Sequence, residues 1–284
     1  MSDLTESTLA KLSRLDRRWL FLALWIIILL PYFVNFALPM NVTQRSQDFY
    51  NYLNNMPQGS VVLWGWDVSF AGWSEMEAQG VAVTKLLFKL MAEKGFRIVI
   101  MGYREECGNL PEMVMRQLGM HPTQNQNYGK NYAHIGWLPG GSVGMASFAK
   151  NMRATLPKDW WGTPLDNLQV MKDINTIQDV DLVIYIESGG CELAITQYVV
   201  PYNTNLGVCA IAQNVPGNMP RLDAGLIKIM LAGIRGGAEL EMLTGQLGVG
   251  TKNITGISTT HLVIMGFMLV ANISYFLRRS RGEI

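Results

Sequence analysis

Two long stretches without a charged residue lie near the ends of this 284-residue chain, and they constrain its fold more than any other feature. Residues 19–38 read WLFLALWIIILLPYFVNFAL and residues 261–277 read HLVIMGFMLVANISYFL. An α-helix needs about 20 apolar residues to cross the roughly 30 Å hydrocarbon core of a bilayer. The first run meets that length, and the uncharged residues 254–260 extend the second. The sequence therefore predicts two transmembrane helices, at 19–38 and 257–277, in contact with the lipid bilayer.

A cleaved signal peptide is the alternative interpretation of the first run. Its apolar stretch is longer than the roughly 7–15 residues of a typical signal core, and no A-x-A cleavage site follows it. These features favour a retained membrane helix.

Basic residues around the two runs predict the orientation of the chain, because positively charged flanks stay in the cytoplasm. Seven lie on the terminal sides and only two, Arg45 and Lys252, lie close to the runs on the other side. The seven are Lys11, Arg14, Arg17, Arg18, Arg278, Arg279 and Arg281. We therefore expect a cell-membrane protein with cytoplasmic tails at 1–18 and 278–284 and an extracytoplasmic domain at 40–256. The reverse orientation stays open, since long domains can translocate regardless of charge.

The central region alternates strand-like and helix-like segments, which is typical of an α/β domain with a parallel sheet. Apolar runs predict strands at 60–66, 96–102, 132–138, 181–186 and 206–212, and helical patterns occupy 74–94, 110–118, 141–152, 191–199 and 220–243. Strands that are apolar at nearly every position must be covered on both faces. The predicted fold is a Rossmann-like or flavodoxin-like parallel sheet domain between two transmembrane helices.

Polar side chains at the ends of the predicted strands are the candidates for a ligand crevice, because ligands of open parallel sheets bind outside the carboxyl ends of the strands. The candidates are Asp67, Ser69, Glu105, Glu106, Glu187, Ser188 and Cys191. Solvated loop ends are the plain alternative for the acidic ones. The stretch LPGGSVGMAS at 138–147 offers a helix start to an anion, but it lacks the lysine of a P-loop and the G-x-G-x-x-G spacing.

Cys191 lies in the sequence SGGCE, where a helix start would favour a thiolate nucleophile. A cysteine hydrolase also needs a base, and none of the three histidines is suitably placed in the sequence. We therefore predict that Cys191 is not a nucleophile, and we assign no catalytic residue, metal ligand or cofactor. With three cysteines in the chain, Cys107 is its best disulfide partner because both would lie at one edge of the sheet.

The predicted helix at 220–243 has little polar surface, so something must cover more than one side of it. Burial within its own domain is one reading, and contact with another subunit is the other. The second predicts contact residues at the small positions, together with two adjacent loop tryptophans: Gly225, Ala232, Gly233, Gly236, Gly237, Trp160 and Trp161.

The end of this predicted helix, IRGGAELEML at 234–243, resembles a segment in a group of uncharacterised prokaryotic two-pass membrane proteins. The group has no assigned activity, so the resemblance implies a membrane protein and transfers no functional residue.

A net charge of +1 gives no reason to expect a nucleic-acid partner. Asn35 and Asn272 lie at different depths in the two predicted spans, and an intramembrane amide requires a hydrogen-bond partner. These features favour a non-enzymatic structural or interaction subunit of a larger homo-oligomeric assembly, with other copies of the chain and other membrane proteins as partners. The alternative is a membrane-anchored enzyme or small-ligand-binding domain that uses the strand-end crevice.

Overall fold

A computed structural model describes residues 16–34 and 38–280 of the chain. The chain divides into two compact units. One unit comprises Met40–Thr251, and the other comprises Met1–Pro39 together with Lys252–Ile284.

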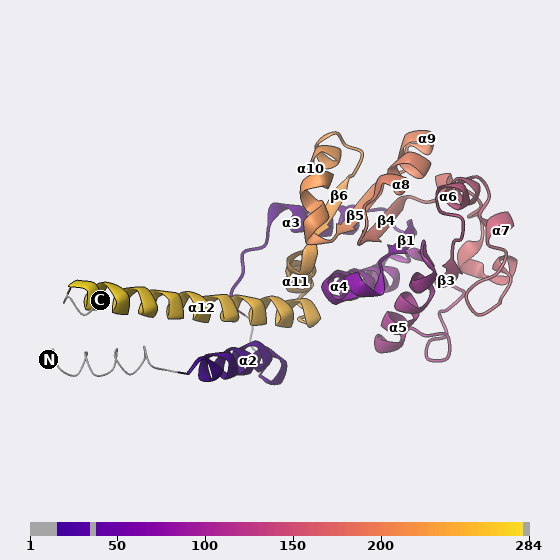
Figure 1. Cartoon of the computed structure of the whole chain (residues 1–284). Helices are drawn as coiled ribbons and strands as arrows, with labels where there is room; N and C mark the ends of the chain where they lie inside the picture. The colour runs from indigo at the N-terminus through magenta and orange to yellow at the C-terminus, as the bar shows by residue number, and fades with distance from the viewer. Residues whose placement is uncertain (1–15, 35–37, 281–284) are drawn as a thin grey trace. The chain divides into compact units, whose positions relative to one another are not determined.

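A six-stranded, fully parallel sheet forms the centre of the unit Met40–Thr251 (Figure 1). Its strand order is β3-β2-β1-β4-β5-β6. The strands are β1 (Val61–Asp67), β2 (Arg97–Gly102), β3 (Tyr132–Trp137), β4 (Leu182–Glu187), β5 (Leu206–Ala210) and β6 (Ile229–Ala232). The predicted α/β domain with a parallel sheet is confirmed, and β6 is a strand that the sequence pattern did not predict.

Helices cover both faces of the sheet because side chains on a strand alternate between its two sides. Trp64 and Trp66 of β1 pack with one set of helices: α3 (Gln44–Asn55), α4 (Phe70–Lys94), α5 (Asn109–Gln117) and α11 (Gly233–Thr244). Leu63 of β1 and Tyr185 of β4 face the other set: α6 (Gly141–Lys150), α7 (Met152–Thr155), α8 (Glu192–Ala194), the π-helical turn η5 (Ile195–Val199) and α10 (Val215–Asp223). The remaining short elements are η1 (Glu105–Gly108), η2 (Leu165–Asn167), η3 (Gln169–Met171), η4 (Ile177–Asp179), α9 (Val200–Tyr202) and η6 (Ala212–Asn214).

Helix α4 begins at Phe70, four residues before the predicted start at Ser74. The side chain of Ser69 accepts a hydrogen bond from the backbone N–H of Gly72 and so caps the first turn. The helix ends where predicted, at Gly95, which adopts the left-handed conformation that favours glycine.

The prediction of one continuous helix at 220–243 was wrong. After α10 the chain turns at Gly225, continues through β6, and starts α11 at Gly233. Both glycines have positive φ, at 73° and 55°, which stops a regular helix. Ile229, Met230 and Leu231 are buried because β6 is covered on both faces of the sheet. The shortage of polar surface therefore reflects a buried strand.

Small residues in α11 serve the core of the domain itself. Gly237 lies against α4 so closely that a Cβ atom there would be 2.6 Å from the carbonyl carbon of Ala78. A Cβ atom on Gly236 would be 3.2 Å from the Cβ of Leu231. These two positions thus support burial within the domain, the alternative to a subunit contact.

Two buried glutamates of α11 bind the first and last segments of this unit. Glu239 accepts hydrogen bonds of 2.6 Å from the hydroxyl of Thr43, before α3, and from Nε of Arg235. Glu241 accepts hydrogen bonds from the backbone N–H groups of Gly248 and Thr251, at 2.9 and 2.8 Å. The first and last segments of the domain are therefore fixed to one helix.

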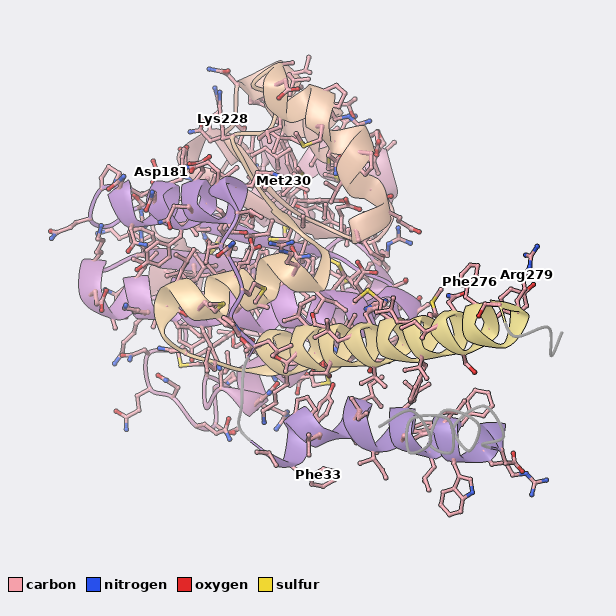
Figure 2. All side chains as sticks on the ribbon, turned by 90° about the vertical axis from the view of Figure 1, so that its left-hand side faces the viewer. Phe33, Asp181, Lys228, Met230, Phe276 and Arg279 are labelled. Carbon is pink, nitrogen blue, oxygen red and sulfur yellow. The ribbon has the colours of Figure 1, made fainter. Side chains whose placement is uncertain are left out.

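The second unit contains α2 (Arg17–Phe33) and most of α12 (Val249–Ser280). Of the described helices, α12 alone is long and apolar enough to cross a membrane, over 249–276 with a mean hydropathy of 1.7. Helix α2 contributes a shorter apolar stretch, Arg18–Phe33. The side chains of Phe33 and Phe276 project away from their helices and are 83% and 63% exposed (Figure 2).

The predicted intramembrane amides have different outcomes. Asn272 donates a 2.8 Å hydrogen bond to the carbonyl of Met268 in its own helix, so it does not require a partner from another chain. Asn35 lies outside the described residues. Tyr32 of α2 donates a hydrogen bond to Oδ1 of Asn253 in α12.

Candidate functional site

A cavity of about 150 Å³ lies at the carboxyl ends of β1, β2 and β4. It is lined by Asp67, Tyr103, Arg104, Leu138, Gly141, Met145, Tyr185 and Leu193. β1 and β4 are neighbours in the sheet, yet the chain after β1 enters α4 on one face and the chain after β4 enters α8 on the other. A crevice for ligands forms at such a point in an open parallel sheet.

Asp67, the last residue of β1, is the polar centre of this cavity. Its Oδ2 accepts a 2.7 Å hydrogen bond from the hydroxyl of Tyr185, and its Oδ1 forms an ion pair with Nε of Arg104. The Asp67 side chain is 10% exposed and that of Arg104 is 45% exposed. Burial tends to lower the pKa of Arg104, but the neighbouring carboxylate raises it above its usual value. The guanidinium of Arg104 therefore keeps its charge at neutral pH.

Gly189 allows Arg104 to lie where it does. A Cβ atom on Gly189 would be only 2.7 Å from Nη2 of Arg104, which is closer than real contacts permit. The loop after β4 thus positions a guanidinium that comes from the loop after β2.

Three tyrosines pack together beside this ion pair. The ring of Tyr103 lies 4.9 Å from that of Tyr185 and 6.3 Å from that of Tyr198, measured between centroids. Burial first, and Asp67 second, raise the pKa of Tyr185 well above its ordinary range. Burial first, and the neighbouring hydroxyl of Tyr198 second, raise the pKa of Tyr103 well above its ordinary range.

Tyr198 belongs to the π-helical turn η5, a rare geometry that occurs frequently at functional sites. The neighbouring Gln197 donates a 3.0 Å hydrogen bond to the hydroxyl of Ser142 in the first turn of α6. Gly141, which opens α6 with a φ of 52°, lines the cavity. The positive end of the α6 dipole therefore lies at one wall of the cavity, whereas Leu138, Met145 and Leu193 make its apolar part.

Of the seven crevice candidates predicted from the sequence, only Asp67 lines this cavity. Ser69 and Ser188 instead close the turn between β1 and α4, where the Ser69 N–H donates a 3.0 Å hydrogen bond to Oγ of Ser188. Glu105 and Glu106 lie in η1, outside the cavity lining.

Glu187 and Cys191 form a separate buried cluster. The carboxylate of Glu187 accepts hydrogen bonds from the Gly190 N–H and from the side chains of Asn214 and Asn218, at 2.6, 2.7 and 3.2 Å. Burial raises the pKa of Glu187 despite these donors. The thiol of Cys191 donates to Oδ1 of Asn218 at 3.3 Å, and burial raises its pKa to about 11. A neutral, buried thiol is a poor nucleophile.

All three cysteines are free thiols. Cys107 donates to the carbonyl of Val68 at 3.2 Å, so it and Cys191 have different partners and the disulfide considered from the sequence is not formed. Burial raises the pKa of Cys107 to about 11 as well.

The loop tryptophans are packed against the domain. Trp160 stacks on the buried His134 with ring centroids 5.5 Å apart, and its indole donates a 2.8 Å hydrogen bond to Glu112. Trp161 packs edge-on against Tyr128, at 5.0 Å. Both rings are half-buried, and their role as oligomer contact residues stays a prediction.

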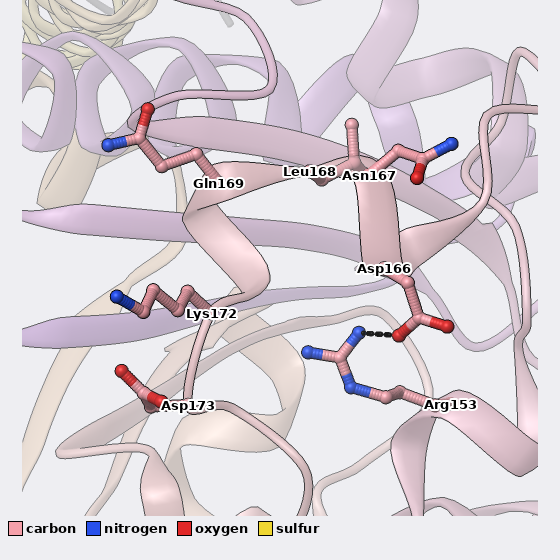
Figure 3. Close-up of a pocket in the computed structure, with 7 residues that line it drawn as sticks. All are labelled: Arg153, Asp166, Asn167, Leu168, Gln169, Lys172 and Asp173. Carbon is pink, nitrogen blue, oxygen red and sulfur yellow. Dashed lines mark hydrogen bonds and ion pairs between the residues drawn. The ribbon is translucent and has the colours of Figure 1, made fainter.

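A second cavity, of about 340 Å³, is lined by Arg153, Asp166, Asn167, Leu168, Gln169, Lys172 and Asp173 (Figure 3). The guanidinium of Arg153 binds Asp166 at 2.6 Å, Asn175 at 2.8 Å and the carbonyl of Met171 at 2.5 Å. The donors of the Arg153 guanidinium thus connect loop segments to one another, and the Asp166 side chain is 81% exposed. We therefore interpret this cavity as a surface hollow whose polar groups serve structural contacts.

Sequence reasoning missed Tyr185 and Gly189 and did not single out Tyr103 or Arg104. Alternation along β4 could have indicated Tyr185, because it shares a face with Glu187 two residues later. Nothing in the local sequence indicates that Arg104 reaches Asp67.

In the described part of the chain, no three metal-ligating side chains gather at one place. Comparison with protein-family models, curated proteins and solved structures finds no match for this chain.

Proposed function

We propose that this chain is a membrane-anchored α/β protein whose extracytoplasmic domain binds a small molecule in the crevice formed by Asp67, Arg104 and Tyr185. The observation that carries this proposal is the cavity at the carboxyl ends of β1, β2 and β4, with an ion pair in its wall. The strand order β3-β2-β1-β4-β5-β6 supports a Rossmann-like assignment.

The alternative, an interaction subunit of a homo-oligomer, has less support. The apolar segment that suggested it contains a buried strand, Gly237 packs on α4, and Asn272 is bonded within its own helix. We therefore favour ligand binding over a structural role.

Two membrane spans are part of the proposal. Helix α12 supports one, and the apolar run 19–38 supports the other, with α2 covering its first part. The excess of basic residues in the tails supports a cytoplasmic location for both termini.

The orientation can be tested with an impermeant maleimide on intact cells. Gln124→Cys places a thiol in an exposed loop of the domain, and Lys11→Cys places one in the N-terminal tail. We expect Gln124→Cys to react in intact cells and Lys11→Cys only after lysis. The opposite pattern would show a cytoplasmic domain.

Ligand binding can be tested on the full chain in mild detergent by screening small metabolites for thermal stabilisation, then by calorimetry. Leu193→Trp should fill the cavity and abolish binding. Val200→Trp is the matched control, because Val200 is 68% exposed and does not line the cavity. The proposal fails if no compound binds or if Leu193→Trp leaves binding unchanged.

A further inference from the structure

We propose that the crevice recognises a small zwitterion, an α-amino acid with a short apolar side chain, with its ammonium group at Asp67 and its carboxylate at Arg104. This inference rests on the proposed function and specifies the ligand of the same site.

The charges in the cavity wall favour a ligand with one charge of each sign. Asp67 and Arg104 form an ion pair in the lining of the cavity, and their formal charges cancel. A ligand with a single charge would leave an unpaired charge in a partly desolvated site, which is costly. A zwitterion introduces one charge of each sign, so the occupied site remains neutral.

The guanidinium of Arg104 has donors that can bind the carboxylate of the ligand. Among the described contacts Arg104 donates a hydrogen bond through Nε, so both terminal nitrogens of its guanidinium remain for a ligand. That planar fork matches a carboxylate. The Gly141 end of α6 adds positive potential at the same cavity.

Asp67 has capacity for an ammonium group. Tyr185 occupies one position on Oδ2 and Arg104 occupies one on Oδ1. Each carboxylate oxygen accepts two hydrogen bonds, so both oxygens can receive another donor. Tyr185 holds the carboxylate in place because its own hydroxyl proton is retained at neutral pH.

The rest of the cavity lining limits the size and polarity of the ligand's side chain. Leu138, Met145 and Leu193 contribute apolar surface, and the volume of about 150 Å³ suits a small molecule. A long or charged side chain would find neither space nor a counter-charge there. Alanine and valine fit this description better than lysine or glutamate.

Gly189 is a positioning residue in this scheme, because any side chain there would displace Nη2 of Arg104. Gly189→Ala should therefore disturb carboxylate recognition without removing a charged group. Gly217→Ala is its matched control, since a Cβ atom there has no neighbour within 4 Å.

The experiment is calorimetry on the full chain in mild detergent with four probes: alanine, valine, propionate and ethylamine. Propionate lacks the ammonium group of alanine, and ethylamine lacks its carboxylate. We expect at least one of the two amino acids to bind, and both half-molecules to bind at least about tenfold more weakly, since each loses a charged contact. Asp67→Asn, Arg104→Gln and Gly189→Ala should each weaken amino-acid binding at least about tenfold, whereas Gly217→Ala should not change it.

The outcomes separate this inference from the proposed function. If propionate or ethylamine binds as tightly as alanine, or if no amino acid binds at a concentration of about 10 mM, the zwitterion assignment is overturned. If the metabolite screen then yields a different ligand that Leu193→Trp excludes, the crevice still binds a small molecule. Gly189→Ala keeps the test informative if Asp67→Asn fails to fold.

Discussion

The carboxylate of Glu241 accepts hydrogen bonds from both the backbone N–H and the hydroxyl of Thr251, at 2.8 and 2.7 Å. The N–H groups of Gly248 and Gly250 donate to the same carboxylate, each at 2.9 Å. The first turn of a helix has N–H groups without partners in the helix, and a negative charge there is favourable. A residue of α11 therefore caps α12, the helix that we assign to the membrane.

Replacing Glu241 with alanine should loosen the start of α12. The change leaves buried donors without an acceptor, which costs about 1–3 kcal/mol for each such group. Hydrogen–deuterium exchange in a peptide covering 248–251 should become at least about tenfold faster in the full chain, a change of about 1.4 kcal/mol. The exchange rate in Glu241→Gln should lie between those of the wild type and Glu241→Ala, because the amide oxygen can still accept hydrogen bonds. Glu93→Gln is the control, since Glu93 is 54% exposed. Unchanged exchange in Glu241→Ala would show that the cap is dispensable.

Gly237→Ala should destabilise the domain by about 1–3 kcal/mol, the usual cost of overpacking a core. The new methyl group would be 2.6 Å from the backbone of α4, which cannot move aside as a flexible side chain can. Urea unfolding followed by tryptophan fluorescence measures the loss, with Gly217→Ala as the control. If the Gly237→Ala variant were as stable as the wild type and differed only in oligomeric size, Gly237 would instead belong to a subunit contact.

The buried thiols predict an alkaline loss of stability. Folding raises the pKa of Cys107 and Cys191 from 9.0 to about 11, so their neutral forms stabilise the native state below pH 9. That contribution is lost as the pH rises from 9 towards 11, because the unfolded thiols release protons first. The double variant Cys107→Ala, Cys191→Ala should show a shallower decline of unfolding free energy over this interval. Equal slopes in both proteins would contradict the raised values.

The same thiols should resist alkylation. At pH 7 a thiol with a pKa of about 11 is ionised in about one molecule in ten thousand. We expect iodoacetamide to modify Cys191 only after urea unfolding, as measured by mass mapping. Rapid labelling of Cys191 in the native chain would show an exposed, activated thiolate.

A fragment comprising residues 40–251 should fold without the rest of the chain. It contains both hydrophobic clusters that enclose the sheet, and its two ends are bound to α11 by Glu239 and Glu241. A cooperative urea transition with a midpoint close to that of the full chain would support this expectation. An unfolded fragment would mean that the domain requires the rest of the chain.

Much of the fold could be predicted from the sequence, because buried parallel strands are apolar at nearly every position. The run VDLVIYI before Glu187 is such a pattern, and its last five residues belong to β4. Strand β6 could not be recognised in the same way. It has four residues and lies between segments with helical composition. An apolar run this short is compatible with either a helix or a strand.

The site was less accessible to prediction. Asp67 could be expected at a strand end, but its partners come from the loop after β2 and from the interior of β4. Such a contact depends on strand order, which one sequence does not reveal. The role of Gly189 depends on where a distant arginine lies, so its identity alone indicates only a turn.

The π-helical turn η5 lies between the α-helical segments α8 and α9, and each of its hydrogen bonds spans one more residue than a hydrogen bond of an α-helix does. Removing one residue from Ile195–Val199 would restore regular spacing. It would also rotate the preceding segment relative to the following one by about 100°, the angular step of an α-helix with 3.6 residues per turn. Tyr198 and Gln197 would then no longer face Tyr103 and Ser142, while the sheet would keep every strand. The deletion of one residue would thus alter the surroundings of the crevice while leaving the sheet intact, so the proposed binding site could be gained or lost without a change of fold.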